Sequence, residues 1–275
     1  MKGKTLYVSD MDGTLMGSDS RVSKATAAIL NRLIDERGLL FTVATARTPA
    51  TVVPLMSEVK TTLPYIVLAG AAMWDAQQGT FVDVQSIPHD TVRDISAIFE
   101  KHGLHPFIYR QHGNMIHAHH CGAMSQQEEG FVKERLNTPF KRFFLDNSHY
   151  ATSDDQAMLI FSMNDYATLE RIYNEVRATV DCSPMFYHDI FDPSVGLLEI
   201  YTSGCTKAGA IRRLAQRINA DKIVAFGDNR NDIAMLQAAD HAVAVENAFP
   251  EVKAVAHEVI GPNTADSVAH YIETS

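Results

Sequence analysis

Cysteine is scarce in this chain, which has only Cys121, Cys182 and Cys205 among its 275 residues. The three form no closely spaced pair, which argues against a disulfide framework and against a zinc knuckle. The sequence also lacks a charged-then-apolar signal peptide and any apolar run near the length of a membrane-spanning helix. These absences predict a soluble protein of a reducing compartment, the cytoplasm, with no membrane partner.

Positive charge is also in short supply. The chain has 24 Lys and Arg against 33 Asp and Glu, a formal net charge of −9. Such a balance argues against nucleic acid as the main partner, and an anionic substrate must then be met by local cations or by a metal. The hydrophobic content of 46% is ordinary for a globular protein, and the length suits one large domain or two modest ones. No obligate protein partner is indicated.

Two carboxylates follow the strand-like run Thr5-Leu6-Tyr7-Val8 near the start of the chain. Asp10 and Asp12 are one residue apart, so in an extended segment their side chains can point toward the same space. Carboxylates that crowd together repel one another unless a cation lies between them, and hard oxygen ligands suit Mg²⁺. The alternative is a hairpin turn at Asp12-Gly13, but it leaves Asp10 unexplained and no strand follows Leu15.

Strand-like and helix-like stretches alternate in two parts of the chain, a pattern typical of a doubly wound parallel α/β sheet. Between them lie hairpin patterns and helices, typical of an α+β unit. We therefore predict an α/β core of residues 1–84 and 189–275, interrupted by an inserted domain of residues 85–188. The strands expected in the core cover residues 5–8, 39–44, 65–69, 197–201, 223–226 and 242–245.

Polar residues follow several of these strands. Thr45-Ala46-Arg47 comes after the second strand, and Asp228 comes after the strand at 223–226. Lys207 opens a predicted helix. Because ligands bind beyond the carboxyl ends of parallel strands, these groups can converge with Asp10 and Asp12 in one cleft.

These motifs, in this order, resemble the four motifs of the haloacid dehalogenase superfamily: Asp10-Met11-Asp12-Gly13-Thr14, Thr45, Lys207, and Gly227-Asp228-x-x-Asn231-Asp232. The large insert, and the tail from Glu246-Asn247-Ala248 to Ala256, resemble the Cof-type phosphatase branch. The resemblance implies a Rossmann-like core with an inserted α/β cap that selects the substrate.

The resemblance also implies a reaction. A Mg²⁺-dependent phosphatase would hydrolyse a phosphate monoester of a small metabolite through an aspartyl-phosphate intermediate. Asp10 would be the nucleophile and Asp12 the general acid and base. The Mg²⁺ ligands would be the Asp10 and Asp228 carboxylates and the Asp12 backbone carbonyl.

Further roles implied by the resemblance concern the phosphoryl group. The residues expected to bind it are Thr45, Ala46, Lys207 and Asn231. Asp232 and Arg47 are expected to support the residues that touch phosphate or metal. Two positions depart from the family pattern, since Ala46 replaces the usual glycine and Ala69 the usual asparagine. Phosphate binding by the Ala46 backbone is retained if φ at that residue is negative.

Recognition of the leaving group must come from another part of the chain, and the insert is the large segment available for it. Arg110 and His112, beside a predicted hairpin turn, are our candidates, and a polar tip of this kind favours sugar phosphates. A solvated hairpin tip explains the same residues as well. Two alternative functions remain at this point: a phosphomutase of the same superfamily, and a module whose aspartate only accepts a phosphoryl group.

Overall fold

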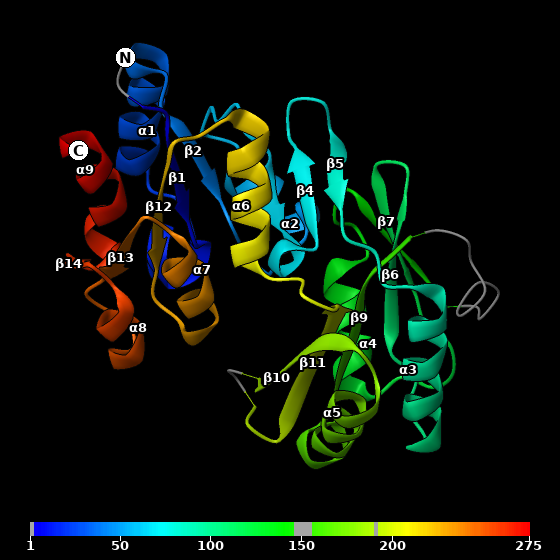
Figure 1. Ribbon diagram of the computed structural model, residues 1–275. Coiled ribbons are helices and arrows are strands. Elements are labelled where there is room, and N and C mark those ends of the chain that lie inside the picture. The colour runs from blue at the N-terminus through cyan, green and yellow to red at the C-terminus, as the bar shows by residue number, and fades with distance from the viewer. Residues whose placement is uncertain (1–2, 146–155, 190–191) are drawn as a thin grey trace. The chain divides into compact units, whose positions relative to one another are not determined.

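The computed structural model describes residues 3–145, 156–189 and 192–275. By their internal contacts these form two compact units (Figure 1). The core unit contains Met1–Asp83 and Thr206–Ser275, and the inserted unit contains Val84–Cys205. Within the described ranges, every helix is too short or too polar to cross a bilayer.

The core unit is built on five parallel strands in the order β14-β13-β12-β1-β2. β1 lies between β12 and β2, and it is fully buried at Leu6 and Val8 on one face and at Ser9 on the other. Strands buried on both faces are expected in a parallel sheet that helices cover. The predicted doubly wound fold is therefore confirmed. The strands are β1 (Thr5–Ser9), β2 (Leu40–Val43), β12 (Lys222–Gly227), β13 (His241–Val245) and β14 (Glu258–Ile260).

Helices cover both faces of this sheet. Figure 1 shows α1 (Lys24–Arg37) and α9 (Ser267–Thr274) on one face, and α6 (Lys207–Ile218) and α7 (Ile233–Ala238) on the other. Local sequence signals set the ends of α1. The Ser23 hydroxyl accepts the Thr26 N–H at its start, and Gly38 ends it in the left-handed conformation. Two shorter helices, α2 (Pro49–Leu55) and α8 (Pro250–Val255), each begin at a proline.

A smaller three-stranded sheet adjoins β2 in the core unit. Its strands are β3 (Tyr65–Val67), β4 (Ala72–Asp75) and β5 (Thr80–Val84), and a parallel bridge joins Ala44 to Ile66. The sequence predicted β3 but not the β4–β5 pair. That pair is stabilised by an edge-to-face contact between Trp74 and Phe81, whose ring centroids are 4.8 Å apart. Because this contact depends on the pairing of the two strands, the sequence alone does not indicate it.

The inserted unit contains a six-stranded sheet in the order β10-β11-β9-β6-β7-β8. β7 and β8 are parallel, whereas the other neighbours are antiparallel. Two of its helices pack on one face of this sheet through a buried apolar cluster that includes Phe99, Ile160 and Leu169. Its elements are α3 (His89–Lys101), β6 (Phe107–His112), β7 (Met115–His119), α4 (Gln126–Arg135), β8 (Lys141–Phe144), β9 (Gln156–Asp165), α5 (Tyr166–Thr179), β10 (Cys182–His188) and β11 (Val195–Thr202).

One predicted strand belongs to the other unit. The segment 197–201 was expected to resume the parallel core, but it forms β11, which pairs antiparallel with β9 and β10. Its Leu198 and Ile200 complete the apolar cluster of the inserted unit. The contacts therefore end that unit at Cys205 rather than at residue 188.

Candidate active site

A tight turn after β1 brings the first acidic motif to the carboxyl end of the sheet. Asp10 is still extended, with φ −61° and ψ 161°, and the chain then reverses over Met11–Leu15 with Gly13 at φ +80°. The Asp10 N–H donates to the Phe226 carbonyl of β12 at 2.9 Å. This bond aligns Asp10 with the end of the neighbouring strand, where Asp228 follows.

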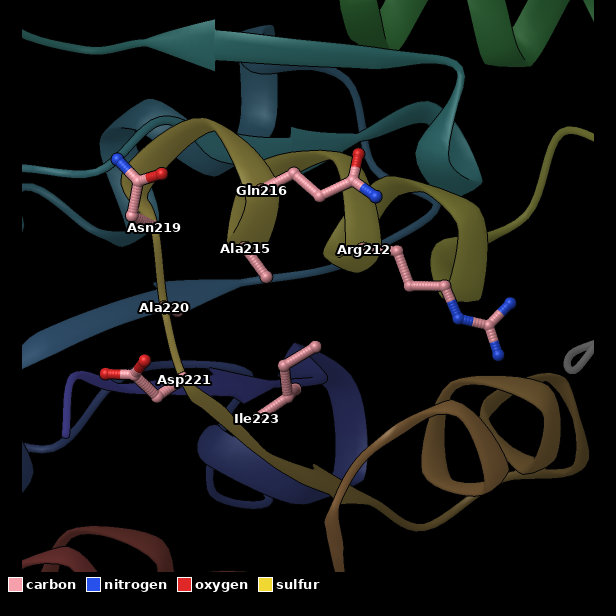
Figure 2. Close-up of a pocket in the computed structure, with 7 residues that line it drawn as sticks. All are labelled: Arg212, Ala215, Gln216, Asn219, Ala220, Asp221 and Ile223. Carbon is pink, nitrogen blue, oxygen red and sulfur yellow. The ribbon is translucent and has the colours of Figure 1, made fainter.

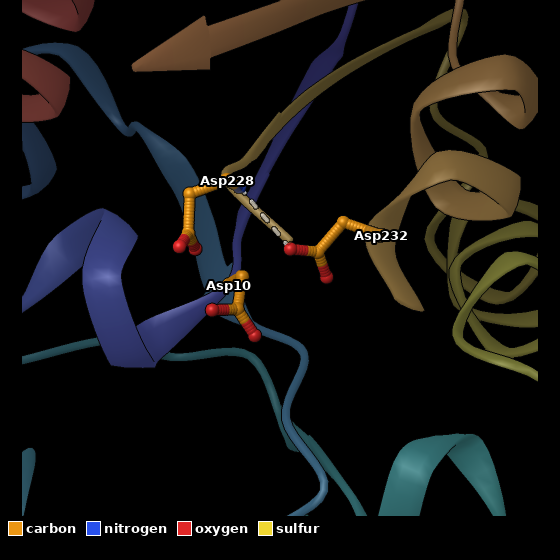
Figure 3. Close-up of side chains that lie close together, drawn as sticks. All are labelled: Asp10, Asp228 and Asp232. Carbon is orange, nitrogen blue, oxygen red and sulfur yellow. Dashed lines mark hydrogen bonds between the residues drawn. The ribbon is translucent and has the colours of Figure 1, made fainter. Parts of the chain in front are cut away.

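Three carboxylates meet at this point (Figure 3). One oxygen from each of Asp10, Asp228 and Asp232 lies within 4.8 Å of the others. Asp10 is 6% exposed and Asp232 is fully buried. The Thr14 hydroxyl donates to Oδ1 of Asp228 at 2.7 Å, so the turn after β1 also orients the carboxylate that follows β12.

Lys207 supplies positive charge to this cluster. Its Nζ lies 2.5 Å from Oδ1 of Asp10 and 2.7 Å from Oδ1 of Asp232, and its side chain is 4% exposed. Burial works against the ammonium, but the charges of Asp10 and Asp232 outweigh it and raise the pKa of Lys207. The Thr206 hydroxyl accepts the Gly209 N–H and starts α6, which places Lys207 in the first turn of the helix.

The carboxylates carry more negative charge than one ammonium can balance. Burial raises the pKa of Asp10 to about 7, although Lys207 acts in the opposite direction. Burial also raises the pKa of Asp228 to about 6, an increase that the Thr14 hydrogen bond limits. Carboxylates whose pKa values are raised in this way are stabilised by binding either protons or a cation. The donor set consists of hard oxygens, the type that Mg²⁺ prefers.

Asp232 acts as a support in this cluster. One of its oxygens accepts from Lys207, and the other accepts the backbone N–H groups of Asp228 at 3.2 Å and Asn229 at 3.1 Å. With both oxygens occupied by donors, Asp232 holds the ammonium and the loop in place. Asp10 and Asp228 remain as the carboxylates able to face a metal.

The Thr45-Ala46-Arg47 segment lies beside the end of β1. The Ala44 N–H donates to the Ser9 carbonyl at 2.9 Å, so the segment starts level with Asp10. Ala46 is not among the described residues with positive φ, so the replacement of glycine there leaves the backbone outside the left-handed region. Ala69 itself adopts φ +52°, and its N–H donates to the Thr45 carbonyl at 2.9 Å.

The structure assembles most of the predicted site residues in the core unit. Asn231 lies exposed in the short turn Arg230–Asp232, next to the buried Asp232. Sequence reasoning missed Asn247, whose side-chain amide donates to the Gly13 carbonyl at 2.7 Å and holds the turn after β1. Its place in the family-like tail was the available signal.

The two predicted recognition residues lie in the inserted unit, and one differs from expectation. β6 extends to His112, so Arg110 lies inside the strand and is only 2% exposed. It is therefore not part of an exposed hairpin tip, because the turn is shorter than predicted. His112 is exposed, and its ring stacks on His117 with centroids 4.5 Å apart.

The core unit has a surface hollow of about 530 Å³ (Figure 2). Its lining includes Arg212 and Gln216 of α6, and Asp221 just before β12. Asp228 follows the opposite end of β12. Arg212 therefore provides a control position on the same helix as Lys207.

Gly13→Ala tests whether the turn after β1 positions Asp228. A Cβ at this residue would collide with Oδ2 of Asp228, and φ +80° is strained for any side chain. The matched control is Gly38→Ala, where φ is +63° but no atom lies within 4 Å of the added Cβ. We expect both variants to lose about 1–2 kcal/mol in free energy of unfolding.

Only Gly13→Ala should also lose turnover, by about 100-fold, since misplacing a reacting group by about 1 Å has an effect of this size. Chemical denaturation and steady-state kinetics measure the two effects. If Gly13→Ala and Gly38→Ala retain the same turnover, Asp228 does not depend on this turn.

Comparison with known proteins identifies the family. The profile of the haloacid dehalogenase-like hydrolases matches residues 7–272. Pyridoxal phosphate phosphatase YbhA of Escherichia coli is 26% identical over 271 residues, which are 96% of this chain and 95% of the relative. HMP-PP phosphatase of Serratia proteamaculans is 25% identical over 270 residues, 96% of this chain and 92% of that protein.

Solved structures show the same fold. A haloacid dehalogenase-like hydrolase from Bacteroides thetaiotaomicron superposes with a TM-score of 0.79 at 22% identity, covering 99% of both chains. A HAD subclass IIB sugar phosphatase superposes with a TM-score of 0.74 at 21% identity, covering 98% of both. The motif-based recognition is thus confirmed: the chain belongs to the haloacid dehalogenase-like hydrolases, in their Cof-type phosphatase branch, and is a phosphoric monoester hydrolase.

Proposed function

We propose that this enzyme hydrolyses the phosphate monoester of a small metabolite with Mg²⁺, through a phosphoryl group carried on Asp10. The observation that carries the proposal is the buried ammonium of Lys207, bonded to both Asp10 and Asp232, with Asp228 alongside. An anionic nucleophile can attack an anionic phosphoryl group only if nearby positive charge offsets their repulsion.

The residues divide the reaction between them. An oxygen of Asp10 forms a bond to phosphorus as the bond between phosphorus and the leaving oxygen breaks. The leaving oxygen takes a proton from the Asp12 carboxyl. Water then attacks phosphorus, the Asp10–phosphorus bond breaks, and Asp12 accepts the proton that water loses. Thr45, the Ala46 backbone and Asn231 are proposed to bind the phosphoryl oxygens, and Lys207 to balance their charge.

The proposed Mg²⁺ ligands are the carboxylates of Asp10 and Asp228 and the backbone carbonyl of Asp12. When bound, the ion supplies positive charge where two anions meet. The excess of carboxylates over ammonium groups in this cluster supports a divalent cation, and the oxygens of Asp232 are already occupied by donors.

Mg²⁺ should stabilise the protein most at high pH. The pKa values of Asp10 and Asp228, about 7 and about 6, lie above their ordinary value. The folded metal-free protein therefore binds more protons than the unfolded chain between about pH 4 and pH 7, and this contribution to stability is lost as pH rises through about 7. Mg²⁺ can bind these carboxylates in place of the protons. Near pH 8, Mg²⁺ at 100 times its Kd should therefore raise the free energy of unfolding by about 2.7 kcal/mol, and near pH 5 the increase should be much smaller.

Calorimetric unfolding with and without Mg²⁺ at the two pH values measures this effect. Asp228→Ala should abolish it, whereas Asp35→Ala, which removes an exposed carboxylate paired with Lys60, should leave it intact. Equal stabilisation of the wild type and Asp228→Ala would refute the proposed metal site.

The substrate class is a further part of the proposal. Sugar phosphates are our first class, and the structural similarity to a sugar phosphatase supports their inclusion. The buried position of Arg110 weakens the case for an exposed polar tip. The relatives named for pyridoxal phosphate and HMP-PP give these two compounds an equal place among the candidate substrates. We propose that the inserted unit recognises the leaving group, with the exposed His112 as its candidate residue.

Phosphate release across a panel of sugar phosphates, nucleotides and cofactor phosphates tests this function. The proposal predicts stoichiometric inorganic phosphate and dephosphorylated product with Mg²⁺. A phosphomutase would instead yield an isomeric phosphate ester, and a phospho-acceptor module would stop after one turnover. Either result would overturn the proposal.

A further inference from the structure

The guanidinium of Arg47 grips both oxygens of Asp12. Nε of Arg47 donates to Oδ2 at 2.7 Å, and Nη2 donates to Oδ1 at 2.6 Å. This two-point contact matches the planar guanidinium to the planar carboxylate, and it restricts orientation more than a single ion pair does. The Asp12 side chain is 51% exposed, so packing against other side chains does little to fix its orientation.

The backbone of Arg47 is itself fixed by its neighbours. Its carbonyl accepts the Leu68 N–H at 3.0 Å, and its N–H donates to the Thr45 hydroxyl at 3.2 Å. Leu68 and Ala69 both have φ +52°, a left-handed conformation that is unfavourable by about 1–2 kcal/mol for each residue. Backbone strain of this kind persists where the surrounding structure holds it, and it clusters at functional sites.

We propose that Arg47 is a positioning residue for the acid and base Asp12, an inference that rests on the proposed function. In the first step Asp12 gives its proton to the leaving oxygen and becomes a carboxylate. Arg47 holds that carboxylate in place until it accepts a proton from the attacking water. Arg47 acts through Asp12 and does not itself exchange a proton.

A competing role for Arg47 is direct contact with the phosphoryl group, and the two roles differ in their kinetics. A p-nitrophenolate leaving group needs little protonation, whereas an alkoxide needs an acid. We expect Arg47→Ala to lower kcat/KM for an accepted alkyl phosphate by about 10- to 100-fold, because general acid catalysis contributes about 10²–10⁴-fold. For p-nitrophenyl phosphate the loss should stay below about 3-fold, and inhibition by inorganic phosphate should be unchanged.

A double-mutant cycle isolates the coupling of Arg47 to Asp12. In the Asp12→Asn background, Arg47→Ala should have almost no further effect on the alkyl phosphate, since residues that act as a unit are not additive. Arg47→Lys keeps the charge but not the two-point contact, so it should recover only part of the loss. Arg32→Ala, which removes an arginine paired with Glu273 in the same unit, is the control for general stability.

Two outcomes would overturn the inference. Additive losses from Arg47→Ala and Asp12→Asn would show that Arg47 does not act through Asp12. Equal losses on both substrates, with weaker inhibition by inorganic phosphate, would assign Arg47 to the phosphoryl group. A wild-type enzyme without phosphatase activity would instead refute the proposed function, so the two failures are distinguishable.

Discussion

Asp10→Asn is expected to reduce turnover by at least about three orders of magnitude, because a neutral amide cannot attack phosphorus to form an acyl phosphate. The substitution preserves the shape of a side chain that is only 6% exposed. It also removes one charge from a cluster in which three carboxylates face one ammonium. Lys207 keeps Asp232 as a partner, so we expect a stability equal to or above that of the wild type.

The loss of turnover should therefore occur in a folded protein. Steady-state phosphate release and thermal unfolding measure the two quantities, and acid-quenched mass spectrometry should find the phosphoryl adduct on the Asp10 peptide of the wild type but not on the corresponding peptide of Asp10→Asn. Asp12→Asn is the informative control, because it should still form the adduct with p-nitrophenyl phosphate while hydrolysing it slowly. Turnover of Asp10→Asn near the wild-type rate would exclude Asp10 as the nucleophile.

The central site could be predicted from sequence because its residues occupy strand ends. Asp10 follows β1 and Asp228 follows β12, and the two strands are neighbours in the parallel sheet. Once a doubly wound sheet is recognised, the carboxyl ends of its strands must meet at one edge. The position of a residue at a strand end does not identify Lys207, which begins a helix, and a lysine at a helix start is usually solvated. Only its place in the ordered motifs singled it out.

What sequence reasoning did not predict depends on pairings between distant segments. β11 has the same apolar character as a core strand, and nothing local distinguishes an antiparallel partner from a parallel one. Arg110 was misplaced because hairpin length sets how far a strand extends, and β6 continues through Arg110 to His112, which places Arg110 in a buried position.

The contact between Arg47 and Asp12 was equally hidden. The two residues are 35 positions apart, and the sequence gives no side-chain direction for an arginine after a strand. The left-handed residues Leu68 and Ala69, whose N–H groups donate to the carbonyls of Arg47 and Thr45, also break the usual preference of such positions for glycine or asparagine. Local propensity therefore predicts the opposite of the observed backbone at this point.

Lys207→Met is expected to have the largest effect on stability. Methionine fills a similar volume but leaves the buried Asp10 and Asp232 and the half-buried Asp228 together with no ammonium. Breaking a buried ion pair by removing one partner reduces the free energy of unfolding by about 3–5 kcal/mol. The loss should be largest near pH 8 and smaller near pH 5, since the carboxylates can take up protons as the pH falls below the pKa of Asp10, about 7.

Catalytic activity should also be lost, and a second substitution separates the two effects. Lys207→Met combined with Asp232→Asn removes one of the stranded charges, so it should recover part of the stability without recovering turnover. Arg212→Ala, in an exposed position on the same helix, should change neither quantity. Denaturant unfolding at the two pH values, together with phosphate release, checks these expectations. If Lys207→Met unfolds like the wild type near pH 8, then the ammonium does not hold the carboxylates together, and its role is confined to the phosphoryl group.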